Sequence, residues 1–285
     1  MKFKYIFAFF FSWIFFGCNN QKYNPVKYPK NYIAQIDTIY HAVDSWEGRI
    51  DLYTNPTSDK PTPIVLNIHG GGWHHGVKES QTSFGSFFNN GFAVANVEYR
   101  LVDVAPAPAA IEDVRCALIY LLNNAKALNI DTTKIVIMGT SAGGHLALMA
   151  GLLGNNSIFD RSCSYEGDVK VVAIINKYGI TDFNPIAKME SKKRWLDDRY
   201  NDQEFIKSVS PINYVSKNSP PVFIAHGNLD TIVPYSQSVK LYNTLQKFGV
   251  TTKFLTIPNA GHGKLTKEEE DLFRNNMWFF LNKII

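Results

Sequence analysis

A serine in a glycine-flanked turn is the first residue able to do chemistry in this chain. Ser141 is the middle residue of Gly139-Thr-Ser-Ala-Gly143, which follows an apolar, β-rich run at residues 135–138 and precedes a helix-like run at 142–153. Gly-x-Ser-x-Gly between a strand and a helix is typical of a sharp, strained turn that exposes the serine hydroxyl at the edge of a sheet. Glycine is needed on both sides because the chain passes close to itself there. The pattern predicts that Ser141 is a nucleophile.

A histidine and an aspartate further along the chain supply what a serine nucleophile needs. The hydroxyl is a weak nucleophile at neutral pH, so it requires a base and an acid that orients the base. His262 lies between two glycines after the apolar run 252–257, and Asp230 follows the run 222–225. Both fall where parallel strands end, the edge at which doubly wound sheets place their sites. We expect Asp230 to hold His262, and His262 to take the proton from Ser141.

Asp182 is the alternative to Asp230, because it also follows an apolar run, at residues 171–175. Asp230 is favoured since it precedes the histidine by one strand–helix–strand unit. We expect Asp182 to brace a loop.

Three consecutive glycines follow the apolar run 64–68, in the stretch His69-Gly-Gly-Gly-Trp73. Attack on a carbonyl carbon places negative charge on its oxygen, and N–H groups aimed at that oxygen stabilise it. The glycines let the backbone turn its N–H groups into a cavity, so we expect Gly71 and Gly72 to be donors, together with Ala142 after the nucleophile. A phosphate loop fits poorly because no Gly-Lys-Ser or Gly-Lys-Thr follows, and the glycine spacing does not complete a dinucleotide fingerprint.

Histidines crowd the same stretch: His69, His74 and His75. Zinc needs three or four ligands held by rigid elements, and no cysteine or carboxylate adjoins this loop. We therefore expect no metal and no cofactor, and interpret His69 as the residue that anchors the loop. Arg100 is expected to form structural ion pairs with Glu112 and Asp113 near the loop.

Short apolar runs that alternate with helix-like stretches predict the elements that must position these residues. Runs of strand character lie at residues 64–68, 92–97, 135–138, 171–175, 222–225 and 252–257, and helix-like stretches at 109–127, 142–153, 236–248 and 265–283. Residues 36–43 and 48–53 indicate an opening hairpin. Nearly continuous apolar strands are typical of a parallel sheet buried on both faces. The sequence therefore predicts an α/β fold with a doubly wound, mostly parallel sheet. The polar and aromatic stretch 184–218 interrupts the alternation, either as a small cap or as a plain surface excursion.

Composition excludes several classes of protein. Apolar residues make up 45% and charged residues 19%, which is typical of an ordered globular chain. A formal net charge of +4 without a basic stripe excludes a nucleic-acid partner.

Three cysteines cannot build a disulfide framework for a chain of this length. Cys116 and Cys163 could pair outside the cytoplasm, but we expect two free thiols.

The beginning of the chain has the pattern of an export signal. Two lysines precede an apolar run at residues 5–16, which is shorter than the ~20 residues of a membrane-spanning helix. The junction Gly17-Cys18 resembles the lipobox of bacterial lipoproteins, although Phe15 and Phe16 depart from the common pattern. The resemblance implies that Cys18 is lipid-modified. An ordinary signal peptide with an incidental cysteine is the alternative.

These features divide the chain into three parts. We expect a signal peptide at residues 1–17, a tether at 18–34, rich in Asn, Lys, Tyr and Pro, and a catalytic domain at 35–285. The protein is then expected to be exported and held by its lipid anchor to the periplasmic or cell-surface side of a bacterial membrane.

Six motifs in order resemble those of the bacterial hormone-sensitive-lipase-like esterases of the α/β-hydrolase superfamily, and most of all the carbohydrate esterases of acetyl-xylan and feruloyl type. The motifs are His69-Gly-Gly-Gly-Trp73, Tyr99-Arg-Leu101, Pro108-Ala-Ala-Ile-Glu-Asp113, Gly139-Thr-Ser-Ala-Gly143, His226-Gly-Asn-Leu-Asp230 and Gly261-His-Gly263. The resemblance implies a cofactor-independent serine esterase that acts on short-chain or aromatic acyl esters, of carbohydrates or other small molecules. Trp73, Tyr178 and Trp195 are candidate walls for the acyl group or sugar ring. Many relatives have Pro and Glu where this chain has Val102-Asp-Val104, so we expect a different acyl pocket.

Two other functions remain open. Prolyl-oligopeptidase-like serine peptidases also carry His-Gly-x-x-Asp and Gly-His-Gly, but they usually have a large additional domain that controls access. A catalytically silent, glycan-binding lipoprotein is the other possibility. Such proteins commonly lose a member of the catalytic triad, whereas Ser141, Asp230 and His262 are all present here.

Overall fold

The computed structural model describes residues 23–184, 186 and 189–285. The expected signal peptide and Cys18 lie outside the described residues. Within those ranges, no helix is both long and apolar enough to cross a membrane.

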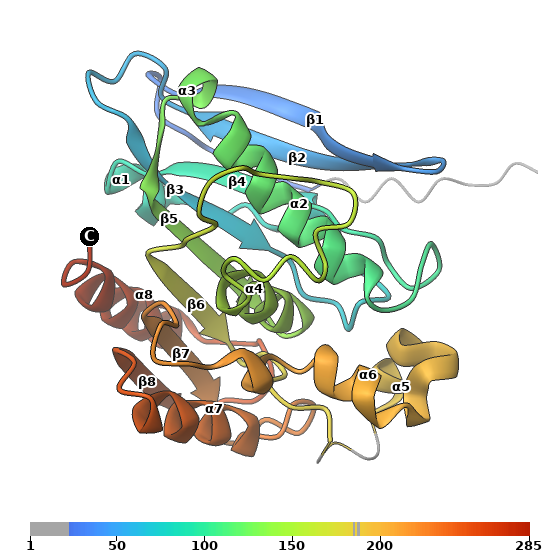
Figure 1. The fold of residues 1–285 in the computed structure, drawn as a ribbon. Helices are drawn as coiled ribbons and strands as arrows, with labels where there is room; N and C mark the ends of the chain where they lie inside the picture. The colour runs from blue at the N-terminus through green and yellow to red at the C-terminus, as the bar shows by residue number, and fades with distance from the viewer. Residues whose placement is uncertain (1–22, 185, 187–188) are drawn as a thin grey trace, which may run out of the picture.

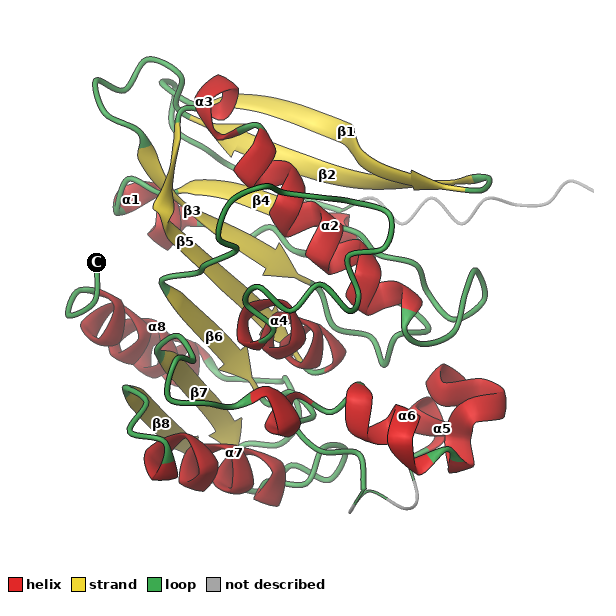
Figure 2. Ribbon diagram, in the orientation of Figure 1, coloured by secondary structure: helices red, strands yellow, loops and turns green. Residues whose placement is uncertain are grey.

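An eight-stranded sheet organises the described chain, in the order β1-β2-β4-β3-β5-β6-β7-β8 (Figures 1 and 2). The strands are β1 (Ile33–Val43), β2 (Trp46–Thr54), β3 (Thr62–Ile68), β4 (Ala93–Val97), β5 (Ile130–Thr140), β6 (Ala173–Lys177), β7 (Val222–Gly227) and β8 (Thr252–Ile257). The pairs β1–β2 and β2–β4 are antiparallel, and the other neighbouring strands are parallel. The structure thus confirms the predicted doubly wound, mostly parallel α/β sheet.

The continuous apolar strands supply two layers of core. In β3, Ile64 and Leu66 belong to one buried cluster and Val65 to the other, because successive side chains point to opposite faces of the sheet. Burying each such side chain contributes about 1.5–3 kcal/mol. A run that is apolar at every position therefore fits a strand covered on both sides.

Helices cover the two faces of the sheet (Figure 2). One face carries α2 (Ala109–Asn123), α3 (Ala125–Leu128), α4 (Ala142–Leu152) and α7 (Ser236–Lys247), and the other carries α1 (Gly85–Asn89) and α8 (Lys267–Leu281). The helix expected at residues 109–127 is divided into α2 and α3. The second piece ends at Asn129, whose φ of 51° is left-handed.

A disulfide bond joins Cys116 of α2 to Cys163 of the loop between α4 and β6. The expectation of two free thiols was therefore wrong. Arg115 ties the same loop to α2, since its Nε donates to Oδ1 of Asp160 at 2.7 Å. Both contacts depend on the path of the loop across the helix, and sequence spacing does not give that path.

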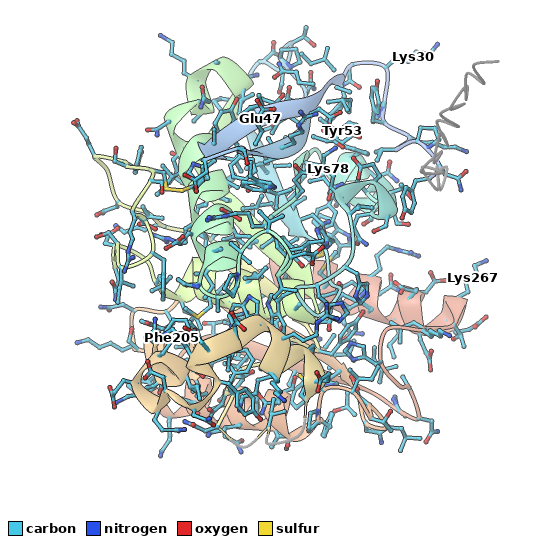
Figure 3. All side chains as sticks on the ribbon, turned by 90° about the vertical axis from the view of Figure 1, so that its right-hand side faces the viewer. Lys30, Glu47, Tyr53, Lys78, Phe205 and Lys267 are labelled. Atoms are coloured by element: carbon cyan, nitrogen blue, oxygen red, sulfur yellow. A yellow bond between two sulfur atoms is a disulfide. The ribbon has the colours of Figure 1, made fainter. Side chains whose placement is uncertain are left out.

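The segment between residues 184 and 218, which we call the cap, contains short helices in its described part: α5 (Glu190–Leu196), η2 (Asp197–Asn201), α6 (Gln203–Ser208) and η3 (Pro211–Tyr214). Figure 1 shows α5 and α6 beyond the carboxyl ends of the parallel strands, and Figure 3 views the molecule from that side. The cap is attached to the residues that follow β6, because Ile212 N donates to Thr181 O at 3.1 Å. It is therefore a small cap at the edge of the sheet where the predicted site lies.

Candidate active site

The predicted nucleophile lies in a strained turn between β5 and α4. Ser141 has φ 53° and ψ −119°, a backbone conformation that costs an ordinary residue on the order of 1–3 kcal/mol. A Cβ added at Gly139 would lie 2.1 Å from the carbonyl oxygen of Gly143, and one at Gly143 would lie 2.3 Å from that of Ile68. The two glycines are therefore required by close backbone packing, as the sequence pattern predicts.

The structure brings together the three side chains predicted to act on one another. Nε2 of His262 lies 2.9 Å from Oγ of Ser141, and Nδ1 lies 2.6 Å from Oδ2 of Asp230. The three residues follow β5, β7 and β8, which end at the same edge of the sheet. A carboxylate only accepts hydrogen bonds, so Nδ1–H donates to Asp230 and leaves Nε2 of the neutral ring to accept the serine proton.

Asp230 is held as an anion in a buried setting. Its Oδ1 accepts hydrogen bonds from the N–H groups of Ile232 and Val233, at 2.8 and 2.9 Å. Burial by itself raises the pKa of Asp230, but hydrogen bonds from His226 and His262 outweigh that effect and hold the pKa well below its usual range. The carboxylate can therefore orient His262 at neutral pH.

Residues 69–76, which we call the glycine loop, lie against the nucleophile turn. A Cβ added at Gly70 would lie 2.8 Å from the carbonyl oxygen of Thr140. Gly71 and Gly72 have φ of 125° and 57°, conformations that favour glycine. As the first residue of α4, Ala142 has an N–H without an acceptor inside the helix. The N–H groups predicted to stabilise the oxyanion thus belong to two adjacent segments, the glycine loop and the nucleophile turn.

His69 anchors the glycine loop through its contacts with Gly70 and Tyr99. Its Nδ1–H donates to the carbonyl oxygen of Gly70 at 2.7 Å, and its ring stacks on Tyr99 with centroids 4.4 Å apart. The Tyr99 hydroxyl donates to the carbonyl oxygen of His69 at 3.1 Å. Burial lowers the pKa of His69 to about 4, so the ring is neutral at pH 7.

The three aromatic residues expected to line the substrate site lie in different places. The ring of Tyr178 is 4.8 Å from that of His262, beside the predicted triad. Trp73 and Trp195 are 0% and 1% exposed, so the expectation that they form walls of the site was wrong. They stack on each other within the core, because burying two large apolar rings is more favourable than leaving them in water.

Asp182 braces the start of the cap. It forms an ion pair with Lys240 of α7, and its Oδ1 accepts from the N–H of Asn184 at 2.9 Å. Its own N–H donates to Oε1 of Gln237 at 2.8 Å. Asp182 thus ties the loop after β6 to α7, which agrees with the expected role of bracing a loop.

Arg100 forms the buried pairs expected near the glycine loop. Its Nε donates to Asp113 at 2.9 Å and its Nη2 to Glu112 at 3.2 Å. The backbone N–H of Arg100 also donates to Asp113, at 2.7 Å. These contacts fix the strand that ends beside the loop and leave Arg100 no role in the chemistry.

His226 is the residue beside the site that sequence reasoning missed. Its Nε2 lies 3.1 Å from the same Asp230 oxygen that binds His262, and its Nδ1 lies 2.7 Å from Oγ of Ser238. The available signal was its position four residues before Asp230, at the end of β7. The partner on α7 could not be identified from spacing.

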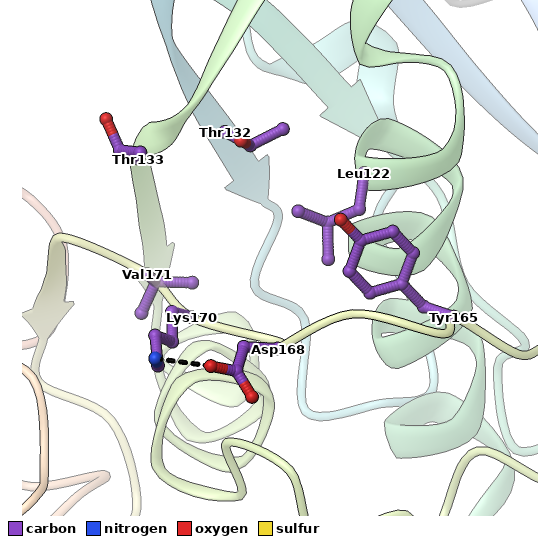
Figure 4. Close-up of a pocket in the computed structure, with 7 residues that line it drawn as sticks. All are labelled: Leu122, Thr132, Thr133, Tyr165, Asp168, Lys170 and Val171. Carbon is purple, nitrogen blue, oxygen red and sulfur yellow. Dashed lines mark hydrogen bonds and ion pairs between the residues drawn. The ribbon is translucent and has the colours of Figure 1, made fainter.

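A pocket of about 380 Å³ lies elsewhere in the molecule, and Figure 4 shows its lining. Thr132 and Thr133 of β5 form one side, and an ion pair between Asp168 and Lys170 lies on the other. Thr133 precedes Ser141 by eight residues of extended chain, which corresponds to about 26 Å. The pocket is therefore separate from the candidate site.

Comparisons with known proteins point to one family. The sequence profile of the BD-FAE family matches residues 50–245 of this chain. Esterase LipC of Mycobacterium tuberculosis (strain ATCC 25618 / H37Rv) is 28% identical over 235 residues, which are 78% of this chain and 56% of LipC. The chain thus spans little more than half the length of that curated relative.

Solved structures with the same fold include two carbohydrate-active esterases. One is a truncated form of a carbohydrate esterase from gut microbiota, with a TM-score of 0.77 and 27% identity over 90% of this chain and 98% of that one. The other is an acetyl ester-xyloside bifunctional hydrolase from Caldicellulosiruptor lactoaceticus, with a TM-score of 0.72 and 26% identity over 85% of this chain and 90% of that one. The resemblance to esterases of the α/β-hydrolase superfamily is thereby confirmed: the chain belongs to the BD-FAE family and has the fold of the α/β-hydrolase esterases.

Proposed function

We propose that this protein is a carboxylic ester hydrolase that works through an acyl-enzyme formed on Ser141. The observation that carries the proposal is the unbroken chain of hydrogen bonds from Asp230 through His262 to Ser141, at 2.6 and 2.9 Å. The same order of acid, base and nucleophile activates serine on several unrelated folds.

In the proposed mechanism, His262 takes the proton from Ser141 as Oγ attacks the ester carbonyl carbon. Asp230 keeps the proton of the ring on Nδ1 and stabilises the imidazolium that forms. His262 then gives the proton to the departing alkoxide, which leaves as the alcohol. In the second half of the reaction, His262 takes a proton from water as the water oxygen attacks the acyl carbon. His262 then returns that proton to Oγ of Ser141 as the bond between Oγ and the acyl carbon breaks, which releases the carboxylic acid and restores both residues.

The glycine loop is proposed to stabilise the oxyanion. Gly71, Gly72 and Ala142 would donate their N–H groups to the oxygen on which negative charge develops. Removing one such donor typically costs about 2.7–4 kcal/mol of transition-state stabilisation. The N-terminus of α4, which begins at Ala142, carries a partial positive charge that would add to this effect.

The substrate is proposed to be a short-chain or aromatic acyl ester of a carbohydrate. The support comes from the two solved relatives, one a carbohydrate esterase and the other active on acetyl esters and xylosides by its description. Tyr178 is the proposed wall of the site, because its ring contacts His262. A panel of acetyl, feruloyl and longer acyl donors of one sugar tests this assignment, and a preference for long acyl chains would contradict it.

The activity itself is tested with p-nitrophenyl acetate. Ser141→Ala should abolish hydrolysis while the far-UV and near-UV circular dichroism spectra stay those of the native protein. Ser83→Ala is the matched control, since Ser83 is exposed and lies in a loop outside the site. Hydrolysis by Ser141→Ala at the native rate would mean that the nucleophile is another residue.

The protein is also proposed to be an exported lipoprotein anchored at Cys18. The Cys116–Cys163 disulfide supports export, because disulfides persist in oxidising compartments. Metabolic labelling with an alkyne fatty acid tests the anchor. The native chain should be labelled and Cys18→Ala should not, whereas equal labelling of both would contradict the assignment.

A further inference from the structure

His226 occupies a place next to the proposed triad that the mechanism above does not use. The side chain is 0% exposed and lies at the end of β7, between Tyr178 and Tyr235, whose ring centroids are 6.2 and 5.5 Å from its own. We propose that His226 and Ser238 are positioning residues. They hold the Asp230 carboxylate in place and reduce the negative charge that its oxygen presents to His262. This inference rests on the proposed function.

The hydrogen-bond partners determine which nitrogen of His226 carries the proton. Nε2 lies 3.1 Å from the carbonyl oxygen of Val233 and 3.1 Å from Oδ2 of Asp230. A carbonyl oxygen and a carboxylate oxygen can only accept, so Nε2–H donates and is shared between them. In the neutral ring, Nδ1 must then accept.

Ser238 provides the donor that this tautomer needs. Its Oγ lies 2.7 Å from Nδ1 of His226, and Ser238 is 0% exposed, on the first turn of α7. With its proton directed at Nδ1, the hydroxyl keeps the ring proton on Nε2, facing Asp230. Ser238 thus acts on the carboxylate only through His226.

The two histidines share one oxygen of the same carboxylate. Oδ2 of Asp230 accepts from His226 at 3.1 Å and from His262 at 2.6 Å, while Oδ1 is occupied by two backbone N–H groups. Each donor withdraws negative charge from the carboxylate and restricts its rotation. Removing the His226 donor leaves more charge on the oxygen that faces His262, and so favours the protonated form of His262.

Among the described residues, Tyr178 and Tyr235 pack against His226, and Lys177, next to Tyr178 in the chain, lies 3.8 Å from Glu270. Burial lowers the pKa of Lys177, and Glu270 opposes that effect. Burial raises the pKa of Tyr178, with Glu270 and Asp230 adding to the rise, so this phenol stays neutral through the working range of pH. The Tyr235 hydroxyl is hydrogen-bonded to Oγ1 of Thr256 at 2.5 Å. A change in the acidic limb of the profile of kcat/KM against pH therefore reports on His226, His262 and Asp230.

The test compares His226→Leu, which removes the donor, with His226→Gln, whose amide nitrogen can occupy the place of Nε2. For p-nitrophenyl acetate, His226→Leu should lower kcat/KM by roughly tenfold to a hundredfold, the loss expected for a hydrogen bond to a charged group. The midpoint of the acidic limb of the kcat/KM profile, which reports protonation of the general base, should move to higher pH. His226→Gln should restore most of the rate and the native midpoint.

Ser238→Ala and Ser238→Thr form a second, milder pair that removes no side chain from contact with Asp230. The alanine variant should move the midpoint in the same direction by a smaller amount, and the threonine variant, which keeps the hydroxyl, should not. This pair decides the matter if His226→Leu does not fold. An unchanged midpoint and a kcat/KM within twofold of the native value in the folded alanine or leucine variant would overturn the proposal.

Labelling with a fluorophosphonate separates this failure from failure of the proposed function. If the native protein is labelled at Ser141 while the His226 and Ser238 variants behave as the native enzyme, only the positioning role is wrong. If the native protein is not labelled at Ser141, the proposed function itself is wrong.

Discussion

Trp195 of the cap stacks on Trp73 of the glycine loop, with ring centroids 4.7 Å apart and ring planes at 17°. The carbonyl oxygen of Trp195 also accepts the N–H of Ala107, at 2.8 Å. His145 of α4 packs edge-on against both indoles, and its Nε2–H donates to the carbonyl oxygen of Val209 in the cap at 2.8 Å. The cap therefore supports both the glycine loop and the helix that follows the nucleophile.

Truncation of this stack should weaken both the fold and the proposed catalysis. Trp195→Ala is expected to lower the free energy of unfolding by about 3–5 kcal/mol, the usual cost of deleting a buried aromatic ring. It should also lower kcat, because the glycine loop loses the ring on which Trp73 rests. Trp195→Phe keeps an aromatic ring and should lose much less of both. Urea denaturation and p-nitrophenyl acetate hydrolysis measure the two effects, and native values in Trp195→Ala would show that the cap does not support the site.

The glycine loop should not tolerate a side chain at its centre. A Cβ at Gly71 would lie 1.9 Å from the carbonyl oxygen of His75, so the loop must move in Gly71→Ala. We expect kcat for p-nitrophenyl acetate to fall roughly a hundredfold or more, the effect of losing one oxyanion donor. Gly91→Ala is the control, since Gly91 also has a positive φ but has open space around it. That variant should keep native kcat, and a native kcat in Gly71→Ala would argue against the proposed donor.

The disulfide should stabilise the fold without affecting the chemistry. Cys116 and Cys163 are 47 residues apart in the sequence, and removing a bond that closes such a loop typically costs about 2–4 kcal/mol. The double variant Cys116→Ala with Cys163→Ala should therefore unfold at lower urea concentration, with kcat/KM unchanged. Dithiothreitol should lower the melting temperature of the native protein but not that of the variant. Insensitivity of the native protein would mean that the bond does not stabilise it.

Lowering the pH should destabilise the protein over the pH range in which the buried His69 and His145 stay neutral in the folded state but are protonated in the unfolded chain. Burial lowers the pKa of His69 and of His145 to about 4, against 6.5 for the unfolded chain. The unfolded state therefore binds more protons between these values, and the free energy of unfolding falls as the pH is lowered from about 6.5 to about 4. The loss is on the order of a few kcal/mol for each residue.

Two carboxyls oppose this trend. Burial raises the pKa of Glu98, and it raises that of Asp113 to about 6 against the hydrogen bonds of Arg100, so protonation of both favours the folded state as the pH falls. The two histidines outweigh them. Urea denaturation between pH 7 and 4.5 measures the net slope, and His145→Gln, which keeps a donor for Val209, should make it shallower. A flat profile would show that these rings are not held neutral.

Much of the fold and of the candidate site could be predicted because their physical signals are local. The strand of residues 64–68 is recognisable since burial on both faces requires an apolar residue at every position. The turn at Ser141 is recognisable since crossing backbones exclude a Cβ at Gly139 and Gly143. The three residues of the proposed triad each follow a parallel strand. The carboxyl ends of parallel strands lie at the same edge of the sheet, so the sequence could place the three residues together.

What could not be predicted depends on contacts between distant segments. The disulfide required the path of the loop over α2. The burial of Trp73 and Trp195 required the cap to insert a ring beside the glycine loop, and the position of neither residue in the sequence indicates that contact. The role of His226 required Ser238 on a helix that packs against β7, and no spacing in the sequence identifies that partner.

The central claim is that His262 activates Ser141 as the nucleophile, and covalent labelling measures it most directly. The native protein, treated with a fluorophosphonate, should gain one adduct, which peptide mass mapping places on Ser141. Ser141→Ala should gain none, and His262→Ala, which keeps the hydroxyl but lacks its base, should react at least a hundredfold more slowly. An adduct on another residue, or equal labelling rates in the native protein and His262→Ala, would contradict the claim.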